Sequence, residues 1–127
     1  MNCKAWFKIY TNSIGDDELG YIIESIGIKP GITDGCLYYG LNMVSTDDEH
    51  FQFSVFVHVT LASLFPKKNL LIELKNSFQI QYEVNVKFSD LEEEINLKRS
   101  FNLSDDTISF IKDIDAYYCF NKEYIDL

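Results

Sequence analysis

One stretch of the chain, residues 78–88, alternates strictly between large apolar side chains and polar ones. This period of two is typical of a strand with one buried face, because successive side chains of a strand point to opposite sides of the sheet. The pattern therefore predicts a strand whose apolar set faces a core, and a register shift of one residue would expose the whole set. That set consists of Ile80, Tyr82, Val84, Val86 and Phe88.

The residues that follow this strand supply its expected partner. The mostly polar residues 89–93 are typical of a turn, and apolar residues then alternate with polar ones over residues 95–103, except that Arg99 occupies an apolar position. Two alternating runs joined by a polar turn indicate a pair of antiparallel strands. We therefore expect a hairpin over residues 79–103.

Local signals predict the other elements. Residues 4–11 and 36–45 are expected to be strands, and residues 16–26 a helix that ends at Gly27, because glycine readily adopts the left-handed conformation found after helices. Further expected elements are a helix after Pro66, a helix capped by Ser104 and a strand over residues 116–124. The order β-α-β-α-β-β-α-β predicts one α+β domain over residues 1–127, with helices packed on a mainly antiparallel sheet.

Residues 46–64 fit two different structures. Thr46 and Glu49 form a capping box, in which the hydroxyl at the N-cap and the carboxylate three residues later start a helix. Apolar residues also recur at helical spacing between residues 53 and 64. However, the apolar residues alternate strictly over residues 51–61, which predicts a strand. Periodicity alone leaves both structures open.

Three motifs along the chain carry a resemblance to a known family. They are I-G-I-K-P at residues 26–30, L-F-P-K-K at residues 64–68, and F-N-L-S at residues 101–104 with Ile108, Phe110 and Ile111 after it. This arrangement resembles the bacterial domain-of-unknown-function 4279 family over about residues 6–124. The family is helical before its Pro-Lys-Lys motif, so the resemblance favours a helix over residues 48–64. The family has no established catalytic residues, so the resemblance implies none in this chain.

The charge and the cysteines limit where the chain acts. The 11 Lys and Arg residues and 20 Asp and Glu residues give a net charge of −9. A binder of nucleic acid or of an anionic membrane needs a basic face, so we expect neither partner. No apolar run reaches the roughly 18 residues of a membrane span, and the first residues lack a signal-peptide pattern. Cys3, Cys36 and Cys119 are odd in number and far apart, which indicates buried thiols and a cytoplasmic protein.

The sequence contains no evident catalytic constellation. His50 and His58 are eight residues apart, whereas zinc ligands are spaced more closely, and a capped helix start explains the acids beside His50. The nucleophile elbow, the phosphate-binding lysine loop and the dinucleotide glycine pattern do not occur. We therefore expect a protein that is not an enzyme and that uses no metal and no cofactor.

Acidic clusters are the candidates for binding a partner. Carboxylates at helix starts have a structural reason, because they stabilise the positive end of the helix dipole, whereas the acids after residue 89 lack one. The candidate partner-binding residues are Glu92, Glu93, Glu94, Asp90, Asp47, Asp48 and Glu49. Trp6, Lys8 and Tyr10 lie on the outer face of the first strand, as an aromatic anchor or as the seat for another element, and we expect the second.

These observations favour a binding protein over an enzyme. A small acidic chain without catalytic residues is suited to mask a cationic groove, and charge complementarity speeds such association. We therefore expect an immunity protein that neutralises a basic, nuclease-type bacterial toxin domain by occluding its active site. The alternative is an accessory domain that senses a small molecule held between sheet and helices.

Overall fold

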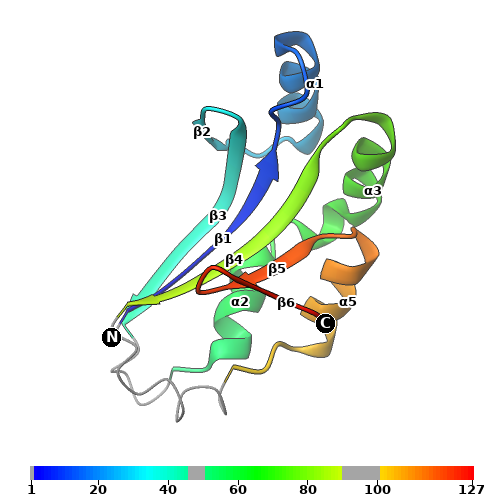
Figure 1. Cartoon of the computed structure of the whole chain (residues 1–127). Helices are drawn as coiled ribbons and strands as arrows, with labels where there is room; N and C mark the ends of the chain where they lie inside the picture. Colours follow the sequence, from blue (N-terminus) through cyan, green and yellow to red (C-terminus); the bar gives the residue numbers. More distant parts are fainter. Residues whose placement is uncertain (1, 46–50, 90–100) are drawn as a thin grey trace.

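The computed structural model describes residues 2–45, 51–89 and 101–127, and Figure 1 shows their arrangement. The strands are β1 (Asn2–Tyr10), β2 (Gly31–Thr33), β3 (Cys36–Ser45), β4 (Gln81–Ser89), β5 (Tyr117–Phe120) and β6 (Glu123–Ile125). The helices are α1 (Asp16–Ile26), α2 (Phe53–Leu61), α3 (Lys68–Ser77) and α5 (Asp105–Asp113), with a short 3₁₀ turn, η1 (Phe65–Lys67), before α3.

The strands form one sheet in the order β2-β3-β1-β4-β5-β6. The central strand β1 is antiparallel to β3 and to β4, and β5 is the strand that runs parallel to β4. The helices lie together on one side of this sheet (Figure 1). The predicted α+β class with a mainly antiparallel sheet is therefore confirmed.

The core lies between the sheet and the helices. The apolar set predicted for this strand is buried, with no member more than 4% exposed; Ile80 lies just before β4 and the other four lie in it, so the predicted face is confirmed. The alternate residues of β1 complete the sheet side of the core, and apolar residues of α1, α2, α3 and α5 cover them. The β1 residues that enter the core are Cys3, Ala5, Phe7 and Ile9.

A bulge in β3 changes which of its side chains face the helices. Ala5 of β1 lies opposite Asn42, but Phe7 lies opposite Tyr39, so two residues of β3 oppose Trp6. The first of the two, Gly40, has a φ of 65°, as a glycine bulge requires. A Cβ atom at Gly40 would clash with the carbonyl oxygen of Thr60 in α2, so this glycine also permits close packing of that helix.

The predicted hairpin over residues 79–103 is wrong in its pairing. β4 has β1 on one side and β5 on the other, and residues 101–103 form no strand. Residues 90–100 lie outside the described residues. The alternation correctly indicated the buried face of β4, but alternation does not specify which strand lies beside it.

Two other elements differ from their expected limits. Residues 53–61 are helical, so the strand interpretation of this segment is wrong. Residues 51 and 52 are not helical, and the helix begins at Phe53. The expected strand over residues 116–124 is instead the hairpin of β5 and β6. Its turn residues Asn121 and Lys122 have positive φ values of 47° and 67°, which suit the tight turn of a two-residue hairpin.

Several local signals are confirmed. Gly27 ends α1 with a φ of 72°, Pro66 lies in the 3₁₀ turn before α3, and Ser104 caps α5 by accepting a hydrogen bond from the Thr107 amide. Among the helices in the described parts of the chain, none is by itself long and apolar enough to cross a membrane. Within the described ranges, one bent pair of helical segments, α2 and the η1–α3 stretch at an angle of 49°, reaches that length and apolarity together.

Candidate functional site

The side of the sheet opposite the helices is rich in aromatic side chains, and we call it the open face. On β1, the residues that alternate with the core residues point to this side, and their register partners on β4 do the same. The aromatic residues of the open face are Trp6, Tyr10, Tyr38, Tyr117 and Tyr124, and its charged residues on β1 and β4 are Lys4, Lys8, Glu83 and Lys87. No helix or strand among the described residues covers this face (Figure 1).

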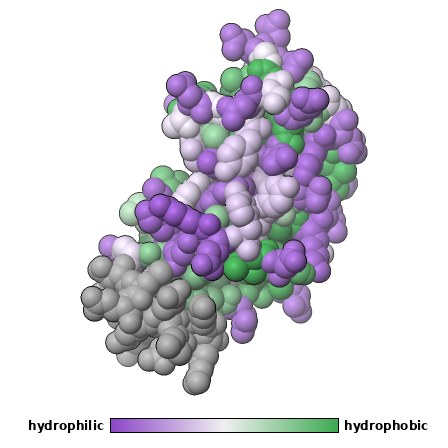
Figure 2. All heavy atoms as spheres, in the orientation of Figure 1, coloured by the Kyte–Doolittle hydropathy of each residue, from purple (hydrophilic) through white to green (hydrophobic). Residues whose placement is uncertain are grey.

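Large apolar and aromatic groups on this face are unusually exposed. Tyr117 and Tyr124 are 50% and 63% exposed, and the β3 bulge leaves Leu41 and Met43 61% and 64% exposed. In Figure 2, pale atoms of intermediate hydropathy form a band over the central strands, with both hydrophilic and hydrophobic atoms around it. Exposed aromatic and methionine side chains of this kind are typical of surfaces that bind other proteins.

The lysines of β1 lie against the aromatic rings. The Lys4 ammonium group is 5.2 Å from the centre of the Trp6 ring, and the Lys8 ammonium group is 4.3 Å from that of Tyr10. The Tyr38 ring lies 5.8 Å from the same Lys8 group. Cation–π attraction therefore holds these two charges on the rings of their own surface.

A buried carboxylate lies among tyrosines at the β4–β6 end of the open face. Glu83 is 4% exposed, and its Oε2 atom accepts hydrogen bonds from the hydroxyl groups of Tyr10 at 3.0 Å and Tyr124 at 2.9 Å. The Tyr117 ring packs edge-on against Tyr124, with centres 5.6 Å apart. These four residues and Gln81 line a hollow of about 470 Å³, which we call the tyrosine cage.

The carboxylate affects the acidity of both hydroxyl groups. The hydrogen bond to Glu83 and the negative charge of Glu83 raise the pKa of Tyr124 above its usual value. Burial raises the pKa of Tyr10, where Lys8 acts in the opposite direction and Glu83 adds to the rise. Both tyrosines are therefore neutral hydrogen-bond donors at physiological pH, and neither is activated as a nucleophile.

A second hollow of about 440 Å³ lies at the other end of the open face. Trp6, Tyr38 and Lys4 line it together with Ile32 and Leu41. The indole nitrogen of Trp6 is buried and has no hydrogen-bond partner within the described residues. This end of the face is apolar and aromatic, whereas the tyrosine cage has a carboxylate at its base.

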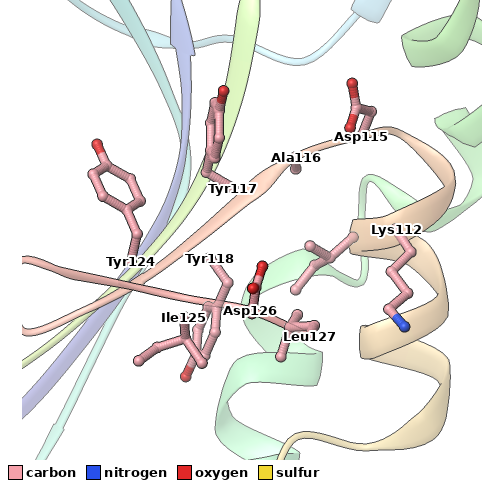
Figure 3. A pocket seen from close by; sticks show the side chains of 10 residues that line it. Lys112, Asp115, Ala116, Tyr117, Tyr118, Tyr124, Ile125, Asp126 and Leu127 are labelled. Carbon is pink, nitrogen blue, oxygen red and sulfur yellow. The ribbon is translucent and has the colours of Figure 1, made fainter.

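A third hollow, of about 790 Å³, lies where β5 and β6 meet α5 (Figure 3). Tyr117 and Tyr124 point to one side of the two strands, and Tyr118 and Ile125 point to the other. The Tyr118 hydroxyl group is buried, and no described group forms a hydrogen bond with it. Burial raises the pKa of Tyr118, so this hydroxyl group is neutral at physiological pH.

The residues predicted to bind a partner are not among those that the structure describes. Residues 46–50 contain Asp47, Asp48 and Glu49, and residues 90–100 contain Asp90, Glu92, Glu93 and Glu94; both segments lie outside the described ranges. His50 lies in the first of these segments. The prediction that these acids bind a partner therefore stays a prediction.

The other residues considered for chemistry have structural neighbours. His58 lies on α2, where its ring packs edge-on against Phe65 at 4.8 Å. Cys3, Cys36 and Cys119 are free and buried, as predicted. Within residues 2–45, 51–89 and 101–127, no group of three or more His, Cys, Asp or Glu side chains is arranged to hold a metal ion.

Comparisons with protein-family models, curated proteins and solved structures find no match to this chain. The resemblance to the domain-of-unknown-function 4279 family therefore stays a prediction.

The sequence predicted only part of the open face. The alternation of β1 placed Trp6, Lys8 and Tyr10 outside the core. No described helix or strand sits on them, and the expectation that another element does so stays a prediction. Glu83 occupies one of the polar positions of the alternating β4 sequence, and this pattern indicated that it lies on the side of the strand away from the core.

Proposed function

We propose that this chain is a non-enzymatic binding protein of the immunity type, which acts in the cytoplasm and neutralises a basic bacterial toxin domain. The open face binds the toxin, and the bulk of the domain behind it blocks the toxin's active site. The observation that carries this proposal is the aromatic face of the sheet, which no described helix or strand covers. A sheet with one face packed on helices and the other left aromatic has that second face free for a partner.

The composition of the open face supports a protein as the partner. Aromatic side chains are enriched among the residues that contribute most to protein–protein affinity, because they bury a large area with few rotatable bonds. Tyr117 and Tyr124 are exposed side chains of this kind, and Trp6 and Tyr38 line the hollow at the opposite end of the face. An interface that covers both ends would bury several aromatic anchors.

The net charge of −9 supports a basic partner. A protein of this charge attracts a cationic toxin domain over distances comparable with the Debye length, about 8 Å at physiological ionic strength. On the open face, the lysines of β1 are held against aromatic rings, and Glu83 supplies a negative charge at the base of the tyrosine cage. In this proposal, the acids outside the face steer the toxin and the aromatic residues anchor it.

The experiment uses the toxin domain encoded beside the gene for this chain. Co-expression of this chain should restore growth of cells that make the toxin domain, and the purified proteins should form a complex. Replacing Tyr117 and Tyr124 with alanine should weaken the complex, while the matched replacement of Tyr21, which is 58% exposed on α1, should leave it unchanged. The proposal is wrong if no neighbouring product binds.

The hollow between β6 and α5 favours a second function, an accessory domain that senses a small molecule. Its position between sheet and helix suits a small ligand, which would lie against Lys112 and Tyr118. A ligand there would raise the melting temperature of the wild type, and would raise that of Lys112→Ala, which lacks one side chain lining the hollow, by less. A gene set among metabolic genes, without a neighbouring secreted toxin, would support this function instead.

A further inference from the structure

We propose that the tyrosine cage binds a basic side chain, lysine or arginine, that the partner inserts against Glu83. This inference rests on the proposed function, because it names the chemical group by which the partner is anchored. It adds a binding site for an organic cation at a defined place on the open face, between β1, β4 and β6.

The Glu83 carboxylate is buried without a counter-ion among the described side chains. It is 4% exposed, and the two ion pairs found among the described side chains, Lys68–Asp113 and Lys75–Asp115, do not include it. A buried charge is costly unless it is paired and hydrogen-bonded. Two neutral hydroxyl groups bond to its Oε2 atom, and no described group donates to Oε1. Glu83 therefore has an oxygen and a negative charge available for a cationic donor.

The lysine nearest to Glu83 in the sheet does not form an ion pair with it. Lys8 lies directly opposite Glu83 in the β1–β4 register, so it is the expected counter-ion. Its ammonium group lies instead within cation–π distance of the Tyr10 and Tyr38 rings, and no ion pair joins it to Glu83 among the described side chains. Lys8 therefore does not pair directly with the carboxylate, and it is not among the residues that line the hollow beside Glu83.

The size and lining of the tyrosine cage suit the end of a long basic side chain. Three tyrosine rings and the Gln81 side chain surround a hollow of about 470 Å³, which exceeds what a bare metal ion needs and suits the end of a long side chain. The faces of aromatic rings attract cations, and the attraction grows when water is excluded. A carboxylate at the base with rings at the rim therefore selects an ammonium or guanidinium group over a neutral or anionic one.

The cage is tested with short blocked peptides and NMR of tyrosine-labelled protein. The probes are acetyl-Gly-Arg-Gly-amide, its lysine counterpart, and a citrulline counterpart that has nearly the same shape and no charge. The cationic peptides should shift the ring signals of Tyr10, Tyr117 and Tyr124 in a saturable manner, and the citrulline peptide should not. Equal shifts with all three peptides would overturn the proposal.

Two pairs of variants separate binding from folding. Glu83→Gln keeps the shape and an oxygen that accepts from the tyrosines, and it should weaken the cationic peptides about tenfold, as expected when a charge-assisted contact is lost. Glu73→Gln, which removes an exposed carboxylate of α3, should not change the affinity. Tyr117→Leu should weaken binding by removing a ring, whereas Tyr117→Phe should preserve it. Unchanged affinity in Glu83→Gln would overturn the proposal.

The same variants distinguish this inference from the proposed function. If the toxin domain binds and Glu83→Gln binds it as tightly as the wild type, the cage is wrong and the proposed function stands. If the peptides bind and the toxin domain does not, the cage stands and the proposed function is wrong. Agmatine, a free cation with the arginine head group, tests the other source of the ligand: binding much tighter than that of the peptides would overturn the assignment to a partner side chain.

Discussion

Replacing Gly40 with alanine should destabilise the protein strongly, because this glycine has two structural requirements at once. Its φ of 65° is unfavourable for a residue with a side chain, at a cost of about 1–2 kcal/mol. Its Cβ atom would also clash with the Thr60 carbonyl oxygen, which belongs to helix backbone and cannot rotate away. Forcing an extra carbon into packed structure costs about 1–3 kcal/mol. The free energy of unfolding should therefore fall by about 2–5 kcal/mol, from a typical total of about 5–15 kcal/mol.

Two other glycines serve as matched controls. Gly35 also has a positive φ, 75°, but its added Cβ would meet the exposed Asn12 side chain, which can move. Gly35→Ala should therefore lose about 1–2 kcal/mol, the backbone cost alone. Gly20 lies within α1 with open space around it, so Gly20→Ala should gain up to about 1 kcal/mol from better helix propensity.

Urea unfolding followed by circular dichroism measures these differences. The expected order of stability is Gly20→Ala, wild type, Gly35→Ala and then Gly40→Ala. If Gly40→Ala is as stable as Gly35→Ala, the close approach of α2 to β3 is wrong. The bulge would then lack the packing against α2 that we assign to it. The exposure of Leu41 and Met43 on the open face, which follows from the bulge, would lose its explanation.

Three further predictions concern single sites. Ser104→Ala removes a side-chain oxygen that caps α5 and should lower the free energy of unfolding by about 1 kcal/mol, measured in urea; no loss would refute the cap. Burial raises the pKa of Cys3 from 9.0 to about 12, so the folded state prefers the neutral thiol. The stability that this contributes is complete below about pH 9 and is lost as the pH rises toward 12; Cys3→Ala should show a shallower loss in unfolding experiments across that range. Charge reversal at Glu92, Glu93 and Glu94 should slow association with the toxin domain, less so at high salt, and leave the melting temperature unchanged; equal association rates at low salt would exclude these acids.

The elements that the sequence predicted well are those set by neighbouring residues. Gly27 ends α1 and Ser104 begins α5 because a left-handed glycine and a capping hydroxyl act within one turn of the helix. The alternation of β4 likewise predicted its buried face. The neighbour of that strand, β5, comes from more than thirty positions further along the chain. Strand pairing depends on tertiary packing, so periodicity did not identify it.

The same limit applies to the candidate site. The sequence placed Trp6, Lys8 and Tyr10 on the outer side of β1, because that conclusion needs only the period of a strand. The tyrosine cage, by contrast, joins Tyr10 to residues of β4, β5 and β6, and the β6 tyrosine depends on a hairpin turn at Asn121 and Lys122. Asn121 is a usual residue for a positive φ, but Lys122 is not, so the sequence carried only half of the signal for that turn.

The most direct test of the proposed function is to record which tyrosines contact the toxin domain. The chain has eight tyrosines: four lie on the open face, three are buried, and Tyr21 lies exposed on α1. With fluorotyrosine incorporated, each gives one ¹⁹F signal, assigned by replacement with phenylalanine. The account predicts that the toxin domain shifts the signals of Tyr10, Tyr38, Tyr117 and Tyr124 and leaves Tyr21 unchanged. A complex that shifts Tyr21 and leaves the four open-face signals unchanged would contradict it.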